Sequence, residues 1–394
     1  MRLIMKKKIL FVNGHLNVGG VEKSLIDILK NFNYEEYEVD LILFEGLGDY
    51  YNELPNEVNL HFLDITSTYG SYKECIKKCL KKKDWFTFFM KIILILSSKI
   101  NQKFLKLARP LLKINKYYDC AIAFRVGFCG EVVGNCVNSK KKICWWHHGE
   151  CQYSEKTRKR MIETFDMFDT IVSVSKGCQL MIENYFGNLT NKTIVIPNMI
   201  DIESIENKAK LFNPYLNDEH EWKFITVGRL SLEKHVDNVV YIANELLQQG
   251  FNNFIWYVVG DGPEKDKIKQ LINEYNIKNY IKLIGSKNNP YPYIYYADLL
   301  IHTSLVESQC LTVLEGLTLQ KPCIVTRSIG PEEFIDQHKN GILTTKDPSD
   351  ISKEVLLLSK NKKLKEILIC NSLKTVQRTY SIEIIMKKIY DSIN

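Results

Sequence analysis

The chain has 394 residues, of which 45% are hydrophobic and 25% are charged, with a formal net charge of +7. This composition is typical of a soluble globular protein, and the length exceeds what one core usually holds, so two domains are expected. The eleven cysteines are scattered, no signal peptide is recognised, and no Cys-x-x-Cys pair has a matching partner, which disfavours a disulfide scaffold and a zinc site.

Apolar strand-like runs alternate with helical patterns through the first half of the chain. A helix is expected over 20–31, directly after the first strand. The strands of this half are expected at 7–13, 39–44, 60–63, 119–124, 143–147, 170–175 and 193–197. Such alternation predicts a parallel sheet with helices on both faces.

The first strand is followed by a loop with two adjacent glycines, Gly19 and Gly20, just before the helix. Glycines at this place allow the backbone to approach the phosphate or the sugar of a ligand. The loop is neither Gly-x-Gly-x-x-Gly nor a P-loop, so a dinucleotide or ATP site is disfavoured. An ordinary tight turn explains the two glycines equally well.

A basic and apolar segment interrupts the alternation between Lys73 and Lys116, where thirteen Lys or Arg residues stand against two acidic ones. Its apolar run over 85–96 is too short to cross a bilayer and contains Lys91. A helix of this composition suits a membrane surface that carries anionic lipid. The alternative is a helical pair that covers the core with solvated lysines outside. Nucleic acid is disfavoured because the aromatic residues are mixed with long aliphatic ones.

A further strand of the first half ends in Trp-Trp-His147-His148-Gly-Glu. Histidines inside a core or on a plain surface are the commoner case. A histidine at a strand end, followed by glycine, can however reach a ligand beyond the sheet, so this turn favours a role in the site for His147 or His148. Either of the two can be the one that faces the ligand.

The second half repeats the alternation, with strands expected at 223–228, 254–260, 281–284, 299–303 and 322–326. We therefore expect an N-terminal domain over 1–200 with an insertion at 70–116, a linker over 201–221, a second domain over 222–375 and a C-terminal helix over 376–394 that packs back on the first domain. Ligands of open parallel sheets bind beyond the carboxyl ends of the strands, which places the site in a cleft between two facing sheets.

Two basic residues follow the opening strand of the second half, in Gly-Arg229-Leu-Ser-Leu-Glu-Lys234. A planar guanidinium and a compact ammonium five residues apart can converge on one diphosphate. Plain surface charges are the alternative, but the preceding strand places Arg229 at the edge of the sheet. The next strand ends in Val-Gly260-Asp-Gly-Pro, a turn whose glycines serve shape more than contact.

Two glutamates, Glu307 and Glu315, lie on either side of a predicted strand-to-helix junction. The first belongs to the loop after the strand and the second to the following helix, whose N-terminus offers free N–H groups and a positive dipole end to an anion. Two carboxylates beside an anion make sense when the ligand joins a phosphate to hydroxyl-rich sugars, because carboxylates accept hydrogen bonds from hydroxyls. A nucleotide sugar is such a ligand.

These motifs, in this order and spacing, resemble the family-4 retaining glycosyltransferases of the GT-B fold (glycosyl transferases group 1), of the bacterial surface-polysaccharide type. The resemblance is most specific in Gly-Arg-Leu-x-x-x-Lys, in Val-Gly-Asp-Gly-Pro-Glu and in Glu-x₇-Glu, and it extends from the Gly19-Gly20 loop to Asn340-Gly341. It implies an α/β fold with two Rossmann-like parallel-sheet domains that face each other across a cleft.

Carried onto this chain, the resemblance implies roles for the second half. Arg229 and Lys234 would hold the donor diphosphate and stabilise the leaving nucleotide. Glu307 would contact the transferred sugar, and Glu315 would accept from the ribose hydroxyls. The phosphate would face the backbone of Gln309, Cys310, Leu311 and Thr312.

In the first half, the resemblance implies that Gly19 and Gly20 allow close approach to the donor, and that His148, or its neighbour His147, lies by the transferred sugar. Gly260 is counted with the donor-binding residues. No metal and no cofactor are expected, because Arg229 and Lys234 take the place of a cation. The family often has Gly-Phe-Gly after the first glutamate, where this chain has Ser-Gln309-Cys310.

The resulting expectation is a retaining, metal-independent transferase that moves a sugar from a nucleoside diphosphate, with UDP favoured, to a saccharide or lipid-linked saccharide in surface polysaccharide or glycolipid synthesis. The enzyme is expected in the cytoplasm, with peripheral attachment to the inner face of the plasma membrane through 73–116. The alternatives are an inactive binding module of the same fold, a nucleotide-sugar epimerase or hydrolase, and, least favoured, a nicotinamide-dependent oxidoreductase.

Overall fold

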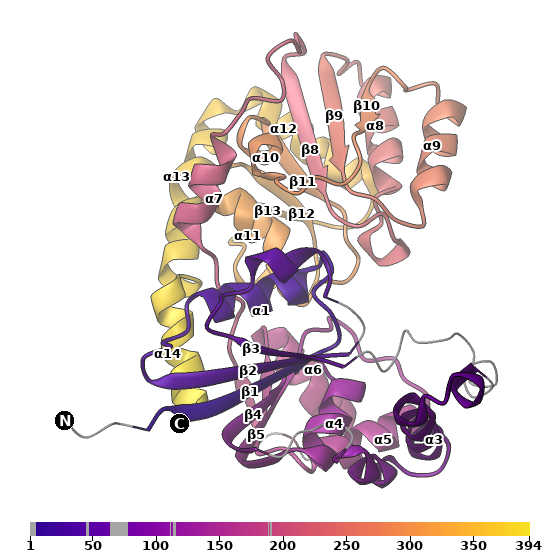
Figure 1. Cartoon of the computed structure of the whole chain (residues 1–394). Helices are drawn as coiled ribbons and strands as arrows, with labels where there is room; N and C mark the ends of the chain where they lie inside the picture. Colours follow the sequence, from indigo (N-terminus) through magenta and orange to yellow (C-terminus); the bar gives the residue numbers. More distant parts are fainter. Residues whose placement is uncertain are drawn as a thin grey trace. The chain divides into compact units, whose positions relative to one another are not determined.

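The computed structural model describes residues 5–44, 47–63, 78–110, 112, 116–187, 189 and 191–394. The chain divides into two compact units, each with one parallel sheet (Figure 1). The N-terminal unit comprises Met1–Val174, Gln179–Met199 and Ile385–Asn394, and the C-terminal unit comprises Ser175–Cys178 and Ile200–Ile384. The predicted α/β architecture with two Rossmann-like parallel sheets is confirmed.

The sheet of the N-terminal unit has seven strands in the order β3-β2-β1-β4-β5-β6-β7. Its central strands are buried on both faces, and β1 is fully buried from Ile9 to Asn13, as is typical of a parallel sheet covered by helices. The strands are β1 (Lys7–Asn13), β2 (Tyr37–Leu43), β3 (Asn59–Phe62), β4 (Tyr117–Ala123), β5 (Asn138–Trp146), β6 (Thr170–Ser173) and β7 (Thr193–Val195). The strand order reverses between β1 and β4, which makes their carboxyl ends a topological switch point.

The helices of this unit are α1 (Gly20–Lys30), α4 (Phe128–Cys136), α5 (Glu155–Phe165), α6 (Lys176–Phe186) and α14 (Ile382–Ile393), with the short helix η1 (Asp49–Glu53). Helix α5 begins after Ser154, whose hydroxyl accepts from the backbone N–H of Thr157. Helix α14 packs on the N-terminal unit, where Tyr390 stacks on Tyr37 with ring centroids 5.4 Å apart.

The described part of the basic insertion forms α3 (Trp85–Lys99) and η2 (Gln102–Ala108). These helices bury Met90 and Leu105 against the N-terminal unit, and Lys91 is only 5% exposed. Residues 70–77, 111 and 113–115 of the predicted insertion lie outside the described residues. In the part of the chain that the structure describes, no helix combines the length and the apolar character that a membrane span requires.

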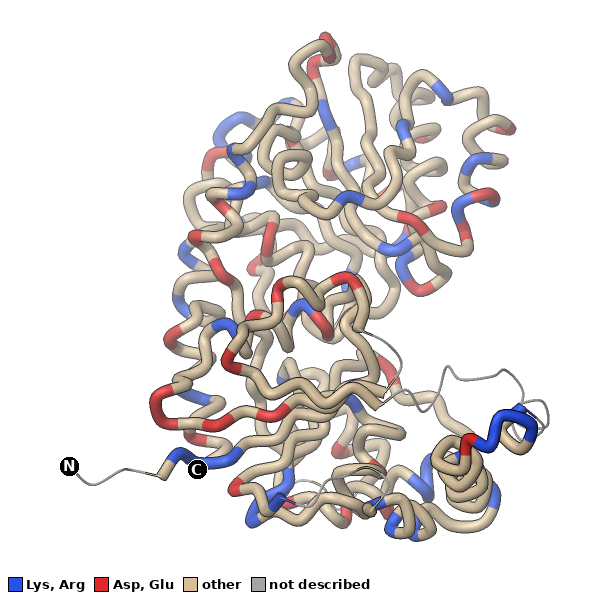
Figure 2. Tube along the Cα trace, in the orientation of Figure 1, with Lys and Arg blue, Asp and Glu red and all other residues tan. Residues whose placement is uncertain are grey.

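The opposite side of α3 exposes large aromatic side chains. Trp85 is 54%, Phe86 39% and Phe89 50% exposed, and we call these three residues the aromatic patch. Four exposed lysines precede it at Lys78, Lys81, Lys82 and Lys83, and Figure 2 shows this run beside the start of α3. The insertion therefore covers the core with one face and exposes aromatic rings next to positive charge with another.

The sheet of the C-terminal unit has six parallel strands in the order β10-β9-β8-β11-β12-β13. They are β8 (Trp222–Val227), β9 (Phe254–Val259), β10 (Ile281–Leu283), β11 (Leu299–His302), β12 (Cys323–Thr326) and β13 (Ile342–Thr344). The last strand was not predicted, because three residues carry too short a pattern. The order reverses between β8 and β11, so this sheet has its own switch point.

The helices around this sheet are α7 (Ile202–Ala209), α8 (Asn238–Gln248), α9 (Lys265–Glu274), α10 (Tyr291–Tyr295), α11 (Leu311–Thr318), α12 (Pro348–Lys360) and α13 (Lys362–Thr379), with the short helices η3 (Leu232–Lys234) and η4 (Pro331–Glu333). The stretch 201–221, expected as a linker, contains α7. Its apolar residues Ile205, Ala209 and Tyr215 belong to a core cluster of the C-terminal unit, and their burial explains why this polar-looking stretch is ordered.

Candidate active site

The predicted residues of the second half gather at the switch point of the C-terminal sheet. Strand β8 runs into Gly228 and Arg229, and β11 runs into the loop that carries Glu307. The carboxyl ends of neighbouring parallel strands lie at one edge of the sheet, where ligands of such sheets bind. The structure thereby brings Lys234 and Glu307, 73 positions apart in the chain, into direct contact.

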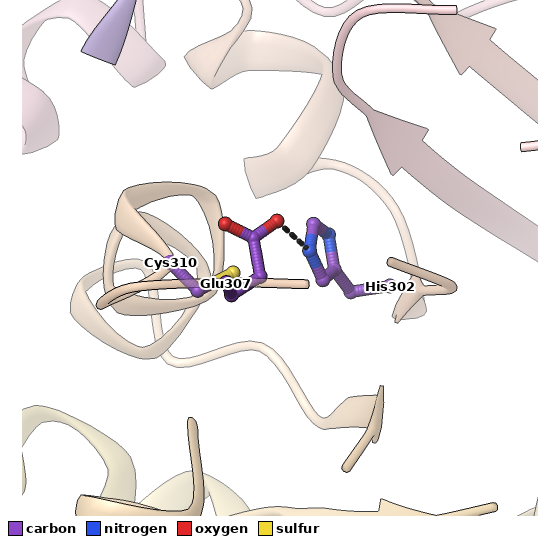
Figure 3. Close-up of side chains that lie close together, drawn as sticks. All are labelled: His302, Glu307 and Cys310. Atoms are coloured by element: carbon purple, nitrogen blue, oxygen red, sulfur yellow. Dashed lines mark hydrogen bonds and ion pairs between the residues drawn. The ribbon is translucent and has the colours of Figure 1, made fainter. Parts of the chain in front are cut away.

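Glu307 is the centre of this cluster. Lys234 Nζ donates to Glu307 Oε1 over 2.6 Å, and His302 Nε2 lies 2.8 Å from the same oxygen. Figure 3 shows the second carboxylate oxygen on the side away from His302. Both contacts fall on one oxygen, so the arrangement fixes the carboxylate while the other oxygen remains available to accept from a ligand hydroxyl.

The electrostatics of the pair favour the charged forms. Burial raises the pKa of the Glu307 carboxyl, but the hydrogen bond from His302 and the charge of Lys234 outweigh this effect and lower the pKa to about 2. Burial lowers the pKa of Lys234, and the Glu307 carboxylate reverses the shift, so that this pKa stands above its usual range. At neutral pH the cluster is an ammonium held against a carboxylate.

Hydroxyl side chains after β11 hold Lys234 in place. Thr303 Oγ1 donates to the Lys234 carbonyl over 3.1 Å, and Ser304 Oγ donates to the Glu233 carbonyl over 3.1 Å. The backbone N–H of Leu305 donates to the same Glu233 carbonyl over 2.9 Å. The short helix η3 is thus tied to the end of β11, which explains how a residue in a loop acquires a defined position.

Glycines allow the loops of this edge to approach each other closely. A Cβ atom on Gly260, whose φ is +151°, would lie 1.8 Å from the Gly228 carbonyl oxygen. A Cβ atom on Gly262 would lie 2.3 Å from the Leu230 carbonyl oxygen, and one on Gly330 would lie 2.6 Å from the backbone nitrogen of Gln309. These glycines are required by backbone-to-backbone packing. Gly260 therefore has a structural reason to be glycine that needs no ligand.

Helix α11 begins directly after Cys310, which adopts a left-handed conformation with φ +71° and makes no side-chain capping hydrogen bond. The first N–H groups of this helix are those that the sequence assigns to the donor phosphate. Within the helix, Glu315 is 6% exposed and accepts a hydrogen bond from Tyr291 Oη over 3.2 Å. Tyr291 was not predicted from the sequence.

Arg229 lies at the end of β8 with an exposed side chain. Among the described residues, no hydrogen bond or ion pair of its guanidinium is found. The loop around it is fixed by the Leu230 N–H, which donates to the Asp261 carbonyl over 3.0 Å. The guanidinium therefore keeps all five donors for a ligand, in contrast to the partnered ammonium of Lys234.

The cluster contains the one set of side chains in the described ranges that matches a metal site. The ligand atoms of His302, Glu307 and Cys310 lie within 4.8 Å of one another (Figure 3). The set fits a divalent cation poorly, because Lys234 Nζ is 2.6 Å from the shared carboxylate oxygen. Burial also raises the pKa of the Cys310 thiol well above its usual range, whereas a metal requires the thiolate.

The N-terminal unit has a second polar cluster at its own switch point. Arg125 follows β4, and its Nη2 lies 2.7 Å from Glu22 Oε1 in helix α1. Glu22 is 2% exposed, and a Cβ atom on Gly19 would lie 2.5 Å from Glu22 Oε2. Gly19 thus leaves room for a buried carboxylate, while Gly20 is exposed at the first position of α1.

The two adjacent histidines after β5 have different surroundings. His147 packs on Phe124 with ring centroids 4.8 Å apart, and burial, reinforced by His148 and Arg125, lowers its pKa to about 3. The residue His148 is exposed at the surface. Partial desolvation of its ring, together with the charge of Arg125, also lowers its pKa. His148 is therefore the one with a ring surface accessible to a ligand, and both rings are neutral at pH 7.

Several buried polar atoms at this edge have no hydrogen-bond partner among the described residues: Asn13 Oδ1, Arg125 Nε and His147 Nε2. Strands β1, β4 and β5, which precede or carry these residues, are neighbours in the sheet. Buried polar groups are normally hydrogen-bonded, so unpaired atoms gathered at one edge suit a place where a polar molecule binds.

Sequence reasoning missed His302, Glu22 and Arg125. His302 is the last residue of β11, and its signal is a histidine inside an otherwise apolar strand directly before the Glu307 loop. Glu22 stands two residues after Gly20, where it reads as a first-turn glutamate of an amphipathic helix. Arg125 follows a buried strand, as Arg229 does, and the same strand-end argument would have found it.

Comparison with known proteins bears on this geometry. Residues 207–375 match the family described as glycosyl transferases group 1. An uncharacterized glycosyltransferase of Methanocaldococcus jannaschii is 26% identical over 250 residues, which cover 60% of this chain and 61% of that protein. The N-acetylgalactosamine-N,N'-diacetylbacillosaminyl-diphospho-undecaprenol 4-alpha-N-acetylgalactosaminyltransferase of Campylobacter jejuni is 26% identical over 335 residues, or 84% of each chain.

The chain spans only 39% to 61% of the length of five of the curated relatives that it matches, the Methanocaldococcus protein among them. The crystal structure of Anabaena HepE in complex with UDP-glucose superposes with a TM-score of 0.75 at 18% identity, over 98% of this chain and 99% of that one. This likeness shows the fold. The predicted resemblance to the group 1 glycosyltransferases is confirmed over residues 207–375, and the relatives named above are glycosyltransferases, the enzyme class that the sequence predicted.

Proposed function

We propose that this chain, whose residues 207–375 match the family described as glycosyl transferases group 1, transfers a sugar from a nucleoside-diphosphate donor to a saccharide or lipid-linked saccharide. The observation that carries the proposal is the contact of Lys234 Nζ and His302 Nε2 with a single oxygen of Glu307 at the C-terminal switch point. A fixed carboxylate beside cations and a helix N-terminus suits a ligand that joins hydroxyls to a diphosphate.

The residues of this edge have distinct parts in the proposed reaction. When the bond between the anomeric carbon and the diphosphate breaks, negative charge grows on the leaving nucleotide, and Arg229 and Lys234 stabilise it. The ammonium of Lys234 uses one donor for Glu307 and keeps two for phosphate oxygens. The free oxygen of Glu307 accepts from the transferred sugar, and Glu315 accepts from the ribose hydroxyls.

UDP is the favoured nucleotide of the donor. HepE is described in complex with UDP-glucose, and pneumococcal GtfA in complex with UDP and GlcNAc, and both have this fold. We also propose that the reaction needs no metal, since two basic side chains are available for the diphosphate and the His302-Glu307-Cys310 set fits a cation poorly. Retention of stereochemistry belongs to the proposal through the family resemblance.

The experiment that tests the donor site is a thermal-shift screen of the purified protein with UDP-, GDP-, ADP- and CMP-sugars and with free UDP, each with and without EDTA. Stabilisation by one nucleotide family that EDTA does not change is expected. Ligand binding to the folded state alone raises the melting temperature by mass action. No shift with any nucleotide would favour the inactive binding module over the transferase.

The acceptor side of the proposal includes a membrane surface. Aromatic rings beside lysines suit an interface with anionic lipid, because the rings enter the boundary of the acyl chains and the charges meet the headgroups. The aromatic patch lies next to the exposed lysines from Lys78 to Lys83. The Campylobacter relative is named for a diphospho-undecaprenol substrate, and an Acholeplasma laidlawii relative is named alpha-monoglucosyldiacylglycerol synthase.

Co-sedimentation with vesicles tests the membrane surface. Binding to phosphatidylglycerol vesicles is expected at low salt and should weaken as salt rises, because screening reduces the attraction. Phe89→Ser should reduce the bound fraction several-fold, whereas Leu107→Ser, an equally exposed apolar position outside the aromatic patch, should not. Equal binding of both variants and the wild type would remove the aromatic patch from the proposal.

A further inference from the structure

The N-terminal unit contains a cavity of about 420 Å³ beside the exposed His148. Helix α5 contributes one side of the cavity through Thr157, Arg160, Met161, Thr164 and Phe165, which recur at intervals of three or four residues and so share one helix face. The remaining lining comes from the ends of β4 and β5, from α4 and from the loop before α5, and includes Val126, Gly127, Glu131, Cys144 and Tyr153.

Most polar side chains of this lining already have partners. Arg160 forms a two-pronged pair with Glu131, in which Nη2 lies 2.6 Å from Oε2, and its Nη1 donates to the Ser97 carbonyl over 2.6 Å. Thr164 Oγ1 donates to Gln102 Oε1 over 2.9 Å. Because these groups satisfy each other, the surface left for a ligand is the carbon of side chains such as Met161 and Phe165.

The volume defines how large an apolar ligand fits. A buried apolar cavity of about 150 Å³ is enough to hold a benzene molecule. A volume of about 420 Å³ therefore accommodates a chain on the order of fifteen carbons by the same proportion. It also lies within the range of ligand pockets, about 300–1,000 Å³, and well above that of packing defects.

We propose that this cavity binds the alkyl or isoprenyl chain of a lipid-linked acceptor, an inference that rests on the proposed transferase function. Two links support this occupant over a water-soluble one. His148, which the family resemblance places by the transferred sugar, lines the cavity, so a chain inside it leaves its polar end at the carboxyl edge of the sheet. Helix α5 is also joined to α3, which carries the aromatic patch, through Arg160 and Ser97.

The first test measures chain binding without donor or transfer. The fluorescent probe 11-(dansylamino)undecanoic acid should bind saturably to the full-length wild type, and dodecyl glucoside should displace it while methyl glucoside should not. Met161→Trp fills the cavity and should weaken probe binding at least tenfold. Lys159→Trp adds the same side chain at an exposed position of α5 outside the lining and should leave it unchanged. Thr157→Trp, at the exposed rim, replaces Met161→Trp if that variant does not fold.

The second test connects the cavity to the acceptor. Stabilisation by UDP should be equal in the wild type, Met161→Trp and Lys159→Trp. If UDP stabilised none of the three proteins, the transferase proposal would be contradicted, but chain binding in the cavity would not. Transfer to alkyl glycosides should show a KM that falls at least tenfold from methyl to dodecyl in the wild type and not in Met161→Trp. Probe binding that Met161→Trp does not alter, or a KM independent of chain length in the wild type, would overturn the inference.

Discussion

The two switch points of this molecule are built from similar residues and differ in how completely those residues are paired. At the C-terminal edge, the buried Glu307 has Lys234 at 2.6 Å and His302 at 2.8 Å. At the N-terminal edge, Glu22 meets Arg125 at 2.7 Å, while buried atoms of Asn13, Arg125 and His147 lack hydrogen bonds among the described residues. The side chains of the first edge hold one another in place, whereas at the second edge buried polar atoms remain unpaired among the described residues.

The largest effects are expected where the C-terminal pairing is broken. Lys234→Ala leaves the Glu307 carboxylate buried without its cation and should destabilise the C-terminal unit by about 3 kcal/mol, as for other buried pairs that lose one partner. Arg229→Ala removes an exposed guanidinium, and no other described group loses a hydrogen-bond partner, so stability should be unchanged. Both should reduce turnover at least a hundredfold, because in the proposed reaction each residue supplies charge that stabilises the leaving diphosphate.

Chemical denaturation and steady-state kinetics of the two variants separate these contributions. An Arg229→Ala enzyme that turns over at the wild-type rate would remove the guanidinium from the diphosphate site. Lys278→Ala, at an exposed lysine distant in sequence from the cluster, serves as a control for the loss of one positive charge.

A smaller effect is expected for ribose recognition at the same edge. Glu315→Ala should raise the dissociation constant of the nucleotide about tenfold, the loss typical of a hydrogen bond to a charged group. Tyr291→Phe removes the hydroxyl 3.2 Å from Glu315 Oε1 and should weaken binding less, since the carboxylate remains. Isothermal titration with UDP measures both. Unchanged affinity in Glu315→Ala would place the ribose elsewhere.

At the N-terminal edge, Gly19→Ala tests whether Glu22 has to occupy its present position. The added Cβ would lie 2.5 Å from Glu22 Oε2, so the carboxylate has to shift away from Arg125. We expect a loss of transfer activity of several-fold with nearly unchanged affinity for UDP. A fall in UDP affinity in Gly19→Ala would return this glycine to the donor site.

The last expected effect is a difference in acid sensitivity. The pKa of His147 is lowered to about 3 in the folded chain, whereas its value in the unfolded chain is near 6.5. Between about pH 6.5 and pH 3 the unfolded state therefore binds more protons than the folded state, and the stability of the fold decreases as the pH falls. The pKa of Glu307 is lowered to about 2, so its contribution is complete above about 4.5 and is lost as pH falls towards 2.

Acidification from pH 6.5 to 5 therefore acts on the N-terminal edge before the C-terminal pair. His147→Leu should flatten the decrease of melting temperature over this interval, by a free energy of at most about 1.4 kcal/mol per pH unit. Scanning calorimetry of the wild type and the variant measures the two slopes. Parallel slopes would mean that His147 does not govern the acid response.

The sequence predicted all seven strands of the N-terminal sheet and five of the six strands of the C-terminal sheet, but it predicted more of the polar cluster in the C-terminal unit than of the one in the N-terminal unit. Arg229, Lys234 and Glu307 follow strand ends in a characteristic spacing, and the structure brings the last two together. The contact of His302 with Glu307, five positions further along the chain, was missed because it depends on the conformation of the loop after β11. Glu22 and Arg125 lie about a hundred positions apart, and only the pairing of β1 with β4 makes them neighbours.

The glycines of the C-terminal edge have a consequence for evolvability. Gly260, Gly262 and Gly330 each bring one loop within atomic contact of the backbone of another, so the loop after β9 is interlocked with the loop after β8, and the loop after β12 with the loop after β11. An insertion or a lengthened loop at one of them would displace the next. Laboratory evolution of a new donor preference should therefore succeed through side chains around Glu307 and Glu315, in libraries that keep these three codons fixed and the loop lengths constant.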